Sequence, residues 1–157
     1  VGILYNHESP RRGYQFVTRK ITAAAARIKL GLQYELQLGN LDATRDWGYA
    51  PEYVEGMWQM VQQNQPEDLI LATGVSRTVR EFVQSVFDYL GLDSELYVRT
   101  DPTLYRESEL LPLVGDASRI RAKLGWSPRK NFEQIIQQMV DHDLQLLEHE
   151  HTQSISV

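Results

Sequence analysis

The most informative absences in this sequence exclude whole classes of protein. None of its 157 residues is a cysteine, which excludes disulfide frameworks and zinc sites built on thiolates. No apolar run approaches the roughly 20 residues of a membrane span. The net charge of −5 argues against a general nucleic-acid-binding surface. Because the N-terminus also lacks the basic and then apolar pattern of a secretory signal, we expect a soluble, cytoplasmic chain with no membrane or nucleic-acid partner.

Several catalytic motifs are absent as well. The sequence has no Gly-x-Gly turn for a dinucleotide pyrophosphate, no tyrosine followed by a lysine four residues later, and no Gly-x-Ser-x-Gly elbow. His142, His149 and His151 could suggest a metal site, but no two of them stand four residues apart, as ligands on one helical face would. We therefore predict no catalytic residue and no metal site in this chain.

What the sequence does contain is an alternation of strand and helix patterns. Apolar spacing predicts the following elements: a strand over 1–5, a helix over 16–30, a strand over 34–38, a helix over 51–63, a strand over 69–73, a helix over 78–90, a short strand over 95–99, a helix over 117–124 and a last helix from Asn131 to about 148. Thr78 and Glu81 fit a capping box, and Gly91 suits a left-handed C-cap. The alternation predicts an α/β fold.

Aromatic residues mark the expected core. Trp47, Trp58 and Trp126 are most simply interpreted as core anchors. The helix over 51–63 has an apolar face that we expect to be buried, formed by Tyr53, Val54, Met57, Trp58 and Val61.

The first twenty residues have the layout of a ligand-binding segment. A strand runs into a polar loop that carries Arg11 and Arg12, and a helix follows from Phe16. In α/β proteins, anionic ligands bind at such a junction of strand, loop and helix. The opening strand has no turn or cap before it, so we expect the chain to be the C-terminal piece of a larger fold. In that case the strand over 1–5, which a complete parallel sheet would bury on both faces, and the helix over 16–30 should expose apolar surface and cause association.

Three basic sites stand beside turns or helix starts: Arg11-Arg12 with Lys20, Arg45 beside Asn40, and Arg106 beside Glu109. Separated cations suit a diphosphate, because its charge is spread over two phosphates and a guanidinium binds phosphate in a bidentate manner. A carboxylate such as that of Glu109 can accept hydrogen bonds from ribose hydroxyls. The alternative interpretation is that these cations are solvated or form surface salt bridges, and that His7 is a structural histidine.

The residues around these sites resemble a known family, the GDP-mannose 4,6-dehydratases, which are extended short-chain dehydrogenases/reductases. The resemblance rests on the following motifs: Asn6-His-Glu-Ser-Pro-Arg-Arg-Gly13, Phe16-Val-Thr-Arg-Lys20, Leu38-Gly-Asn-Leu-Asp-Ala43, Arg45-Asp-Trp-Gly48, Leu71-Ala-Thr-Gly74, Thr78-Val-Arg-Glu-Phe82, and Leu124-Gly-Trp126 with Pro128. The first motif is specific to this family, and the likeness extends to about residue 147. It implies the C-terminal part of an extended Rossmann-type fold: the last strand or strands of the parallel sheet plus the smaller α/β substrate-binding domain.

The resemblance also implies roles for individual residues. His7, Arg12 and Arg11 match a loop that contacts NADP and reaches a neighbouring subunit. The residues that match positions holding the GDP-sugar are Asn6, Val17, Lys20, Gly39, Asn40, Arg45, Arg106 and Glu109. The complete enzyme would bind GDP-mannose and convert it to GDP-4-keto-6-deoxymannose by oxidation at C4, loss of water from C6 and return of the hydride to C6.

The chain departs from the family pattern in two ways. Glu107 stands where the family usually has proline, and a carboxylate there either weakens phosphate binding by the neighbouring arginine or points to solvent. The family's glycine-rich turn and its catalytic residues lie upstream of Val1, so we expect the isolated chain to be inactive without the missing N-terminal half. Residues 1–15 are expected to end the dinucleotide-binding sheet, 16–150 to form the sugar-nucleotide-binding region, and 151–157 to be a disordered tail. We expect the full-length form to be a homo-oligomer.

Two alternatives remain open at this point. The chain could be a non-catalytic nucleotide-sugar-binding or assembly module, or it could be part of a related GDP-sugar epimerase or reductase. Formation of a 4-keto sugar by the isolated chain would contradict the first alternative, a non-catalytic module. The product of the full-length protein would decide the second alternative.

Overall fold

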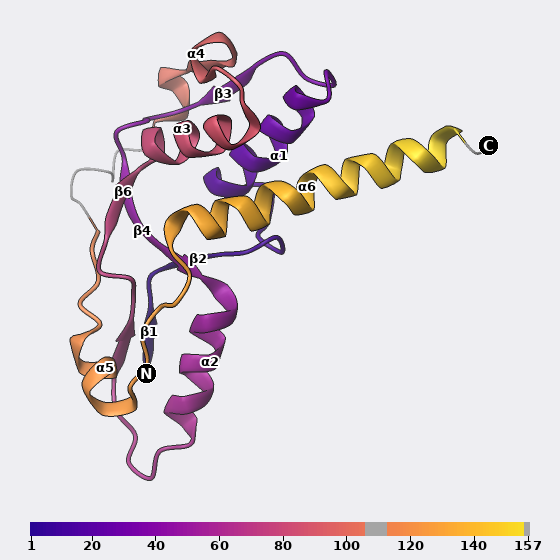
Figure 1. The fold of residues 1–157 in the computed structure, drawn as a ribbon. Helices are drawn as coiled ribbons and strands as arrows, with labels where there is room; N and C mark the ends of the chain where they lie inside the picture. Colours follow the sequence, from indigo (N-terminus) through magenta and orange to yellow (C-terminus); the bar gives the residue numbers. More distant parts are fainter. Residues whose placement is uncertain (106–112, 156–157) are drawn as a thin grey trace.

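The computed structural model describes residues 1–105 and 113–155, and the side chains up to residue 150 (Figure 1). In chain order its elements are β1 (Gly2–Leu4), β2 (Asn6–Glu8), α1 (Val17–Lys29), β3 (Leu36–Leu38), β4 (Thr44–Tyr49), α2 (Ala50–Val61), β5 (Leu69–Leu71), β6 (Ser76–Thr78), α3 (Val79–Leu90), α4 (Ser94–Tyr97), β7 (Val98–Thr100), the 3-10 helix η1 (Pro102–Leu104), α5 (Ser118–Leu124) and α6 (Phe132–Ile155). The predicted α/β class is confirmed. Arg106, Glu107 and Glu109 lie outside the described residues.

The strands form small sheets in which most pairs are parallel. β1 pairs with β5, with Gly2 opposite Leu69, and β3 pairs with β7. β4 lies between β2 and β6, parallel to β2 and antiparallel to β6. Each parallel pair is connected through at least one helix, as parallel strands require. The sequence did not predict β2, β4 or β6 as strands, because their residues are mostly polar and do not form an apolar run.

In the described part of the chain, two apolar clusters make up the core. The first, here called the helical core, lies among α1, α3, α6 and strands β3 and β4, and it includes Ile21, Leu36, Trp47, Phe82, Phe87 and Ile136. The second, here called the sheet core, lies among β1, β5, α2 and α5, and it includes Tyr53, Leu69, Leu71, Ile120 and Trp126. Trp47 and Trp126 are both buried, so their prediction as core anchors is confirmed.

Helix α1 is covered on its apolar side by other helices of the same chain. Ile21, Ala25 and Ile28 are buried in the helical core, where α6 and α3 pack against α1. The expectation that the helix over 16–30 would expose apolar surface therefore holds only at its two ends, where Phe16 and Leu30 are exposed. The same expectation holds for the first strand, since Val1 and Ile3 are exposed.

Helix α2 buries a different face from the one that its apolar residues predict. Tyr53 and Gly56 are buried, whereas Trp58 is 62% exposed and Val61 is 76% exposed. The reason is the close approach of the helix to its neighbours: a Cβ atom on Gly56 would lie 2.5 Å from Leu71 Cδ2 and 2.9 Å from the Trp126 indole nitrogen. The prediction of Trp58 as a core anchor was wrong for the described structure.

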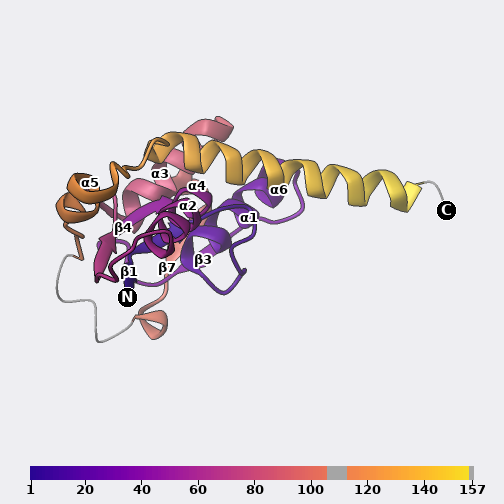
Figure 2. The ribbon, with the colours of Figure 1, turned by 90° about the horizontal axis from the view of Figure 1, so that it is seen from below.

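The ends of several helices agree with the local sequence. Thr78 and Glu81 form the predicted capping box of α3, and Gly91 ends that helix at a φ of 65°. The strand predicted over 95–99 is instead α4, which Asp93 caps by accepting the Glu95 N–H at 2.9 Å, followed by β7. Helix α6 continues to Ile155, beyond its expected end near residue 148, and it extends away from the rest of the molecule (Figure 2). No helix in the described part of the chain could span a membrane.

Candidate functional site

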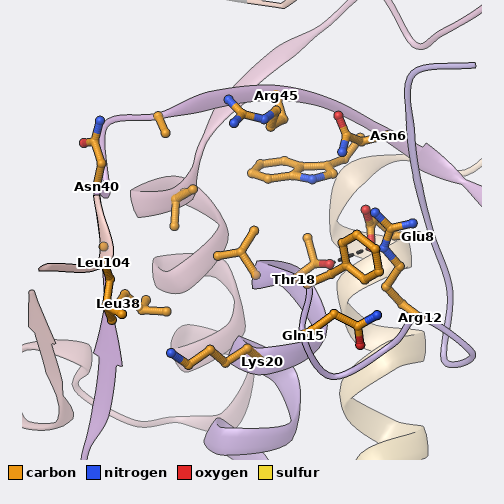
Figure 3. Close-up of a pocket in the computed structure, with 16 residues that line it drawn as sticks. Asn6, Glu8, Arg12, Gln15, Thr18, Lys20, Leu38, Asn40, Arg45 and Leu104 are labelled. Atoms are coloured by element: carbon orange, nitrogen blue, oxygen red, sulfur yellow. Dashed lines mark hydrogen bonds and ion pairs between the residues drawn. The ribbon is translucent and has the colours of Figure 1, made fainter. Parts of the chain in front are cut away.

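A pocket of about 500 Å³ opens where β2, the start of α1 and the turn between β3 and β4 meet (Figure 3). Its lining includes the following residues that the sequence assigned to ligands: Asn6, Arg12, Val17, Lys20, Gly39, Asn40 and Arg45. Every predicted substrate residue that the structure describes therefore lines one pocket. Arg106 and Glu109 lie outside the described residues, so their assignment stays a prediction.

Strand pairing and a close backbone contact position these residues. The parallel register of β2 and β4 places Asn6 opposite Trp47, and both residues line the pocket. At the end of β3, a Cβ atom on Gly39 would lie 2.6 Å from the Leu104 carbonyl oxygen, so only glycine allows η1 to approach the turn. The Asn40 side chain closes this turn by accepting the Asp42 N–H at 2.9 Å.

The buried carboxylate of Asp46 fixes the middle of β4. It accepts hydrogen bonds from the backbone N–H groups of Thr73 and Gly74 at 2.9 Å and from that of Gly115 at 3.2 Å, and from the Thr73 hydroxyl. These bonds tie two other segments of the chain, at Thr73–Gly74 and at Gly115, to the strand that carries Arg45. The Arg-Asp-Trp motif thus combines a pocket cation, a structural anchor and a core aromatic residue.

Three cations border the pocket from different elements, as Figure 3 shows. Lys20, on α1, donates to the Gln37 carbonyl oxygen at 2.7 Å, and Arg45, on the opposite side, donates to the Thr44 carbonyl oxygen at 2.7 Å. Arg12 lies with its guanidinium 3.6 Å from the centre of the Phe16 ring. An arrangement of cations on opposite sides of a cavity suits a ligand with more than one phosphate.

The structure adds a buried carboxylate that the sequence interpretation missed. Glu8 lines the pocket and is only 1% exposed. It accepts a hydrogen bond from the Thr18 hydroxyl at 2.6 Å and forms an ion pair with Arg12 Nε at 3.4 Å. Burial raises the pKa of Glu8, while the Thr18 hydrogen bond and the charges of Arg12 and His7 oppose this shift. The signal in the sequence was the i, i+4 spacing of Glu8 and Arg12 inside the Asn6–Gly13 motif.

Two of the predicted cofactor residues are not among the residues that line the pocket. The His7 ring stacks on Tyr53 with a centroid distance of 5.3 Å, and its Nδ1 donates to the Tyr5 carbonyl oxygen at 2.8 Å. Gly48 makes room for this stack, because a Cβ atom there would lie 2.4 Å from the Tyr53 ring. Arg11 is exposed. The alternative interpretation of His7 as a hydrogen-bonded histidine therefore describes its contacts in this chain.

The remaining lining was not predicted from the sequence. It is formed by Gln15, Phe16, Thr18, Leu38, Ala43, Trp47, Val79 and Leu104, in addition to Glu8. Most of these side chains are apolar and stand inside the family motifs, but the sequence does not distinguish an apolar side chain that lines a pocket from one that packs in the core, so only the tertiary structure could identify them. Within the described residues, no group of three or more metal-binding side chains is gathered at any point.

Comparison with known sequences gives one consistent result. The family model described as GDP-mannose 4,6 dehydratase matches residues 1–139. GDP-mannose 4,6 dehydratase 2 of Arabidopsis thaliana is 54% identical over 149 residues, which cover 95% of this chain and 40% of that protein. GDP-mannose 4,6 dehydratase of Homo sapiens is 43% identical over 163 residues, which cover 93% of this chain and 44% of that protein. The chain thus spans less than half the length of these curated relatives.

Solved structures show the same fold at lower sequence identity. RMD from Pseudomonas aeruginosa, complexed with NADPH, has a TM-score of 0.84 at 21% identity and covers 93% of this chain and 48% of that chain. The dTDP-glucose 4,6-dehydratase from Bacillus anthracis, in complex with NAD, has a TM-score of 0.78 at 18% identity and covers 94% of this chain and 45% of that chain. The expected fold, part of a Rossmann-type α/β architecture, is thereby confirmed.

Proposed function

The chain belongs to the GDP-mannose 4,6-dehydratase family, and we propose that it forms the GDP-mannose-binding part of such an enzyme. One observation carries the proposal: every described residue that resemblance assigns to the substrate lines the same pocket. These residues come from separate segments of the chain, namely β2, α1, the turn after β3, and β4. Surface cations scattered without a function would not be expected to converge in this way.

The pocket suggests how the ligand would be held. In our proposal Lys20 and Arg45, on opposite sides of the cavity in Figure 3, bind the diphosphate. Gly39 and Asn40 lie near the guanine, and Asn6 and Val17 complete the wall. Arg106 and Glu109 are proposed, from resemblance alone, to bind the diphosphate and the ribose.

We further propose that the cofactor is NADP and that Arg11, Arg12 and His7 contact it. The NADPH bound to RMD supports this choice, whereas the Bacillus anthracis enzyme binds NAD. The residues fit an anionic dinucleotide, because Arg11 and Arg12 are cations and the buried Arg12 Nε–H donates no hydrogen bond within the described structure. When bound, NADP supplies the acceptor for the hydride from C4 of the sugar and its source for C6.

The residues of this chain bind and orient the ligands, and we assign none of them a proton transfer. The acid and base that remove the proton at C5 and release water from C6 belong, in this proposal, to the N-terminal half of the family's fold. We also propose that the full-length form is a cytoplasmic homo-oligomer. In this proposal the exposed Arg11 reaches the neighbouring subunit.

The direct test is GDP-mannose binding by isothermal titration calorimetry. We expect the chain to bind GDP-mannose, and the double variant Lys20→Ala/Arg45→Ala to lose about 100-fold in affinity, because two charge-assisted contacts to phosphate disappear. The matched control is Arg27→Ala, which removes an exposed cation from the same helix α1 without touching the pocket.

Equal affinity of the wild type and the double variant would contradict the proposed phosphate contacts. A second arm mixes the chain with GDP-mannose and NADP and measures 4-keto sugar, of which we expect none. Turnover in this assay would show that the chain carries its own catalytic residues.

A further inference from the structure

The carboxylate of Glu8 is unusual because the other charged side chains that line the pocket, those of Arg12, Lys20 and Arg45, are cations. It is almost completely buried, and it lies beside Arg12 and Thr18 at one end of the cavity, with Asn40 and Leu104 at the other end (Figure 3). A carboxylate next to an anionic ligand repels it unless a cation compensates its charge. Arg12 supplies this compensation, since its Nε lies 3.4 Å from Glu8 Oε2.

The contacts of Glu8 all converge on one oxygen. Oε2 accepts the Thr18 hydroxyl at 2.6 Å and faces Arg12 Nε, so Thr18 on α1 fixes the carboxylate that faces the arginine. The arginine also contacts Phe16, whose ring centre lies 3.6 Å from the guanidinium carbon. Arg12 therefore has an anionic neighbour and an aromatic neighbour, and together they define the plane of its guanidinium.

The Nε–H of Arg12 makes no hydrogen bond within the described residues. The separation of 3.4 Å from Glu8 gives an ion pair without a hydrogen bond, and the buried Nε–H donates to no other described residue. A guanidinium that is held in place and keeps free donors is prepared to bind an anionic group.

We propose, on the premise that this pocket binds the proposed nucleotide ligands, that Glu8 is a positioning residue: with Thr18, it holds the Arg12 guanidinium against the pocket wall in a binding-competent orientation. Glu8 does not touch the ligand in this role and acts through Arg12. Both residues belong to the family motif Asn6–Gly13, in which the side chain of Glu8 then orients that of Arg12.

Retaining this carboxylate costs stability. The pKa of Glu8 is raised by burial above its value in the unfolded chain, against the opposing effects of the Thr18 hydrogen bond, Arg12 and His7. The stability linked to a raised carboxyl pKa is fully present below the unfolded pKa and is lost as pH rises through the folded pKa. Glu8→Gln keeps the shape without the charge, so its melting temperature relative to that of the wild type should increase from pH 4 to pH 8. Loss of binding without a loss of stability at pH 8 distinguishes positioning from a purely structural role.

The test combines a readout that needs no ligand with one that does. Nitrogen-15 NMR of the Arg12 Nε–H measures the order of this side chain, and calorimetry measures the affinity for NADP, the ligand to which Arg12 is assigned. In Glu8→Gln we expect a faster-exchanging, less ordered Arg12 and about tenfold weaker binding, which is the weight of one good hydrogen bond. Thr18→Val should show the same loss, whereas Thr18→Ser should retain wild-type behaviour because it keeps the hydroxyl. Glu95→Gln, an equal change of charge on α4 away from the pocket, is the control.

An Arg12 signal that stays equally ordered in Glu8→Gln would overturn the positioning role, and so would a drop in melting temperature without any change at Arg12. If the wild type fails to bind NADP, the proposed cofactor contact of Arg12 fails, and the order of Arg12 still decides whether Glu8 positions it.

Discussion

The helical core and the sheet core differ in how completely the chain covers its own apolar surface. In the helical core, α1, α3 and α6 enclose one another, and even a charged pair, Arg19 with Asp143, is buried between α1 and α6. In the sheet core, α2 covers β1 and β5 with one face but leaves Trp58 and Val61 on the surface. The pocket belongs to the self-contained part, because its residues come from segments that the helical core holds in place. Substitutions in the helical core should therefore lower the free energy of unfolding, whereas substitutions on the outer face of α2 should change self-association.

The largest expected effect comes from breaking the buried ion pair of the helical core. Arg19 and Asp143 are 2.7 Å apart, and each is only 3% exposed. Asp143→Ala would leave a buried guanidinium that cannot lose its proton, and we expect a loss of about 3–5 kcal/mol in the free energy of unfolding. Urea denaturation measures this loss.

The matched control is Asp42→Ala, which removes the exposed partner of Arg80. A surface pair contributes less than about 1 kcal/mol. If Asp143→Ala and Asp42→Ala both lowered the free energy of unfolding by similar small amounts, the claim that the helical core is enclosed would be contradicted.

A smaller effect is expected in the sheet core, at the contact between α2 and β5. The added methyl group of Gly56→Ala meets buried Leu71 and Trp126, and we expect a loss of about 1–3 kcal/mol from overpacking. Chemical denaturation compared with Met57→Ala, at an exposed neighbouring position of the same helix, separates packing from helix propensity. Stabilisation by Gly56→Ala would contradict the close packing of α2 on the sheet.

The smallest effect on stability is expected on the outer face of α2. Trp58→Gln should change the free energy of unfolding by no more than about 0.5 kcal/mol, but it should reduce self-association measured by sedimentation velocity. If Trp58 were a core anchor, its loss would cost roughly 3–5 kcal/mol. The thermal midpoint of this variant therefore decides which of the two interpretations of the helix is right.

The fold could be predicted from the sequence only in part. The α/β class, most helices, the capping box at Thr78 and the stop at Gly91 follow from local patterns, and the structure confirms them. The buried face of α2 could not be predicted, because the apolar stripe that contains Trp58 is the stronger signal in the sequence. The burial of Gly56 depends on its contact with Leu71, which only the tertiary structure shows. In the same way, the strand expected over 95–99 begins only at Val98, because the Asp93 cap starts the helical turn α4 before it.

The candidate site was predicted in part. The motifs identified the polar and charged residues that the pocket gathers, such as Lys20 and Arg45. They did not identify Glu8 as a pocket residue, because a carboxylate in a loop is normally solvated, and only the pairing of β2 with β4 and the packing of α1 bury it. They also placed His7 with the ligand residues, whereas its ring packs on Tyr53 outside the residues that line the pocket.

The most direct test of the central claim is an NMR titration of the labelled chain with GDP-mannose. We expect shifts of backbone amides around the pocket, in residues 6–20 and 38–47, and no shifts on the outer face of α2 at Val54, Trp58 and Val61. We also expect the shifts to disappear in Lys20→Ala/Arg45→Ala. Shifts confined to α2, or an unchanged spectrum at saturating GDP-mannose, would contradict the claim that this pocket binds the sugar nucleotide.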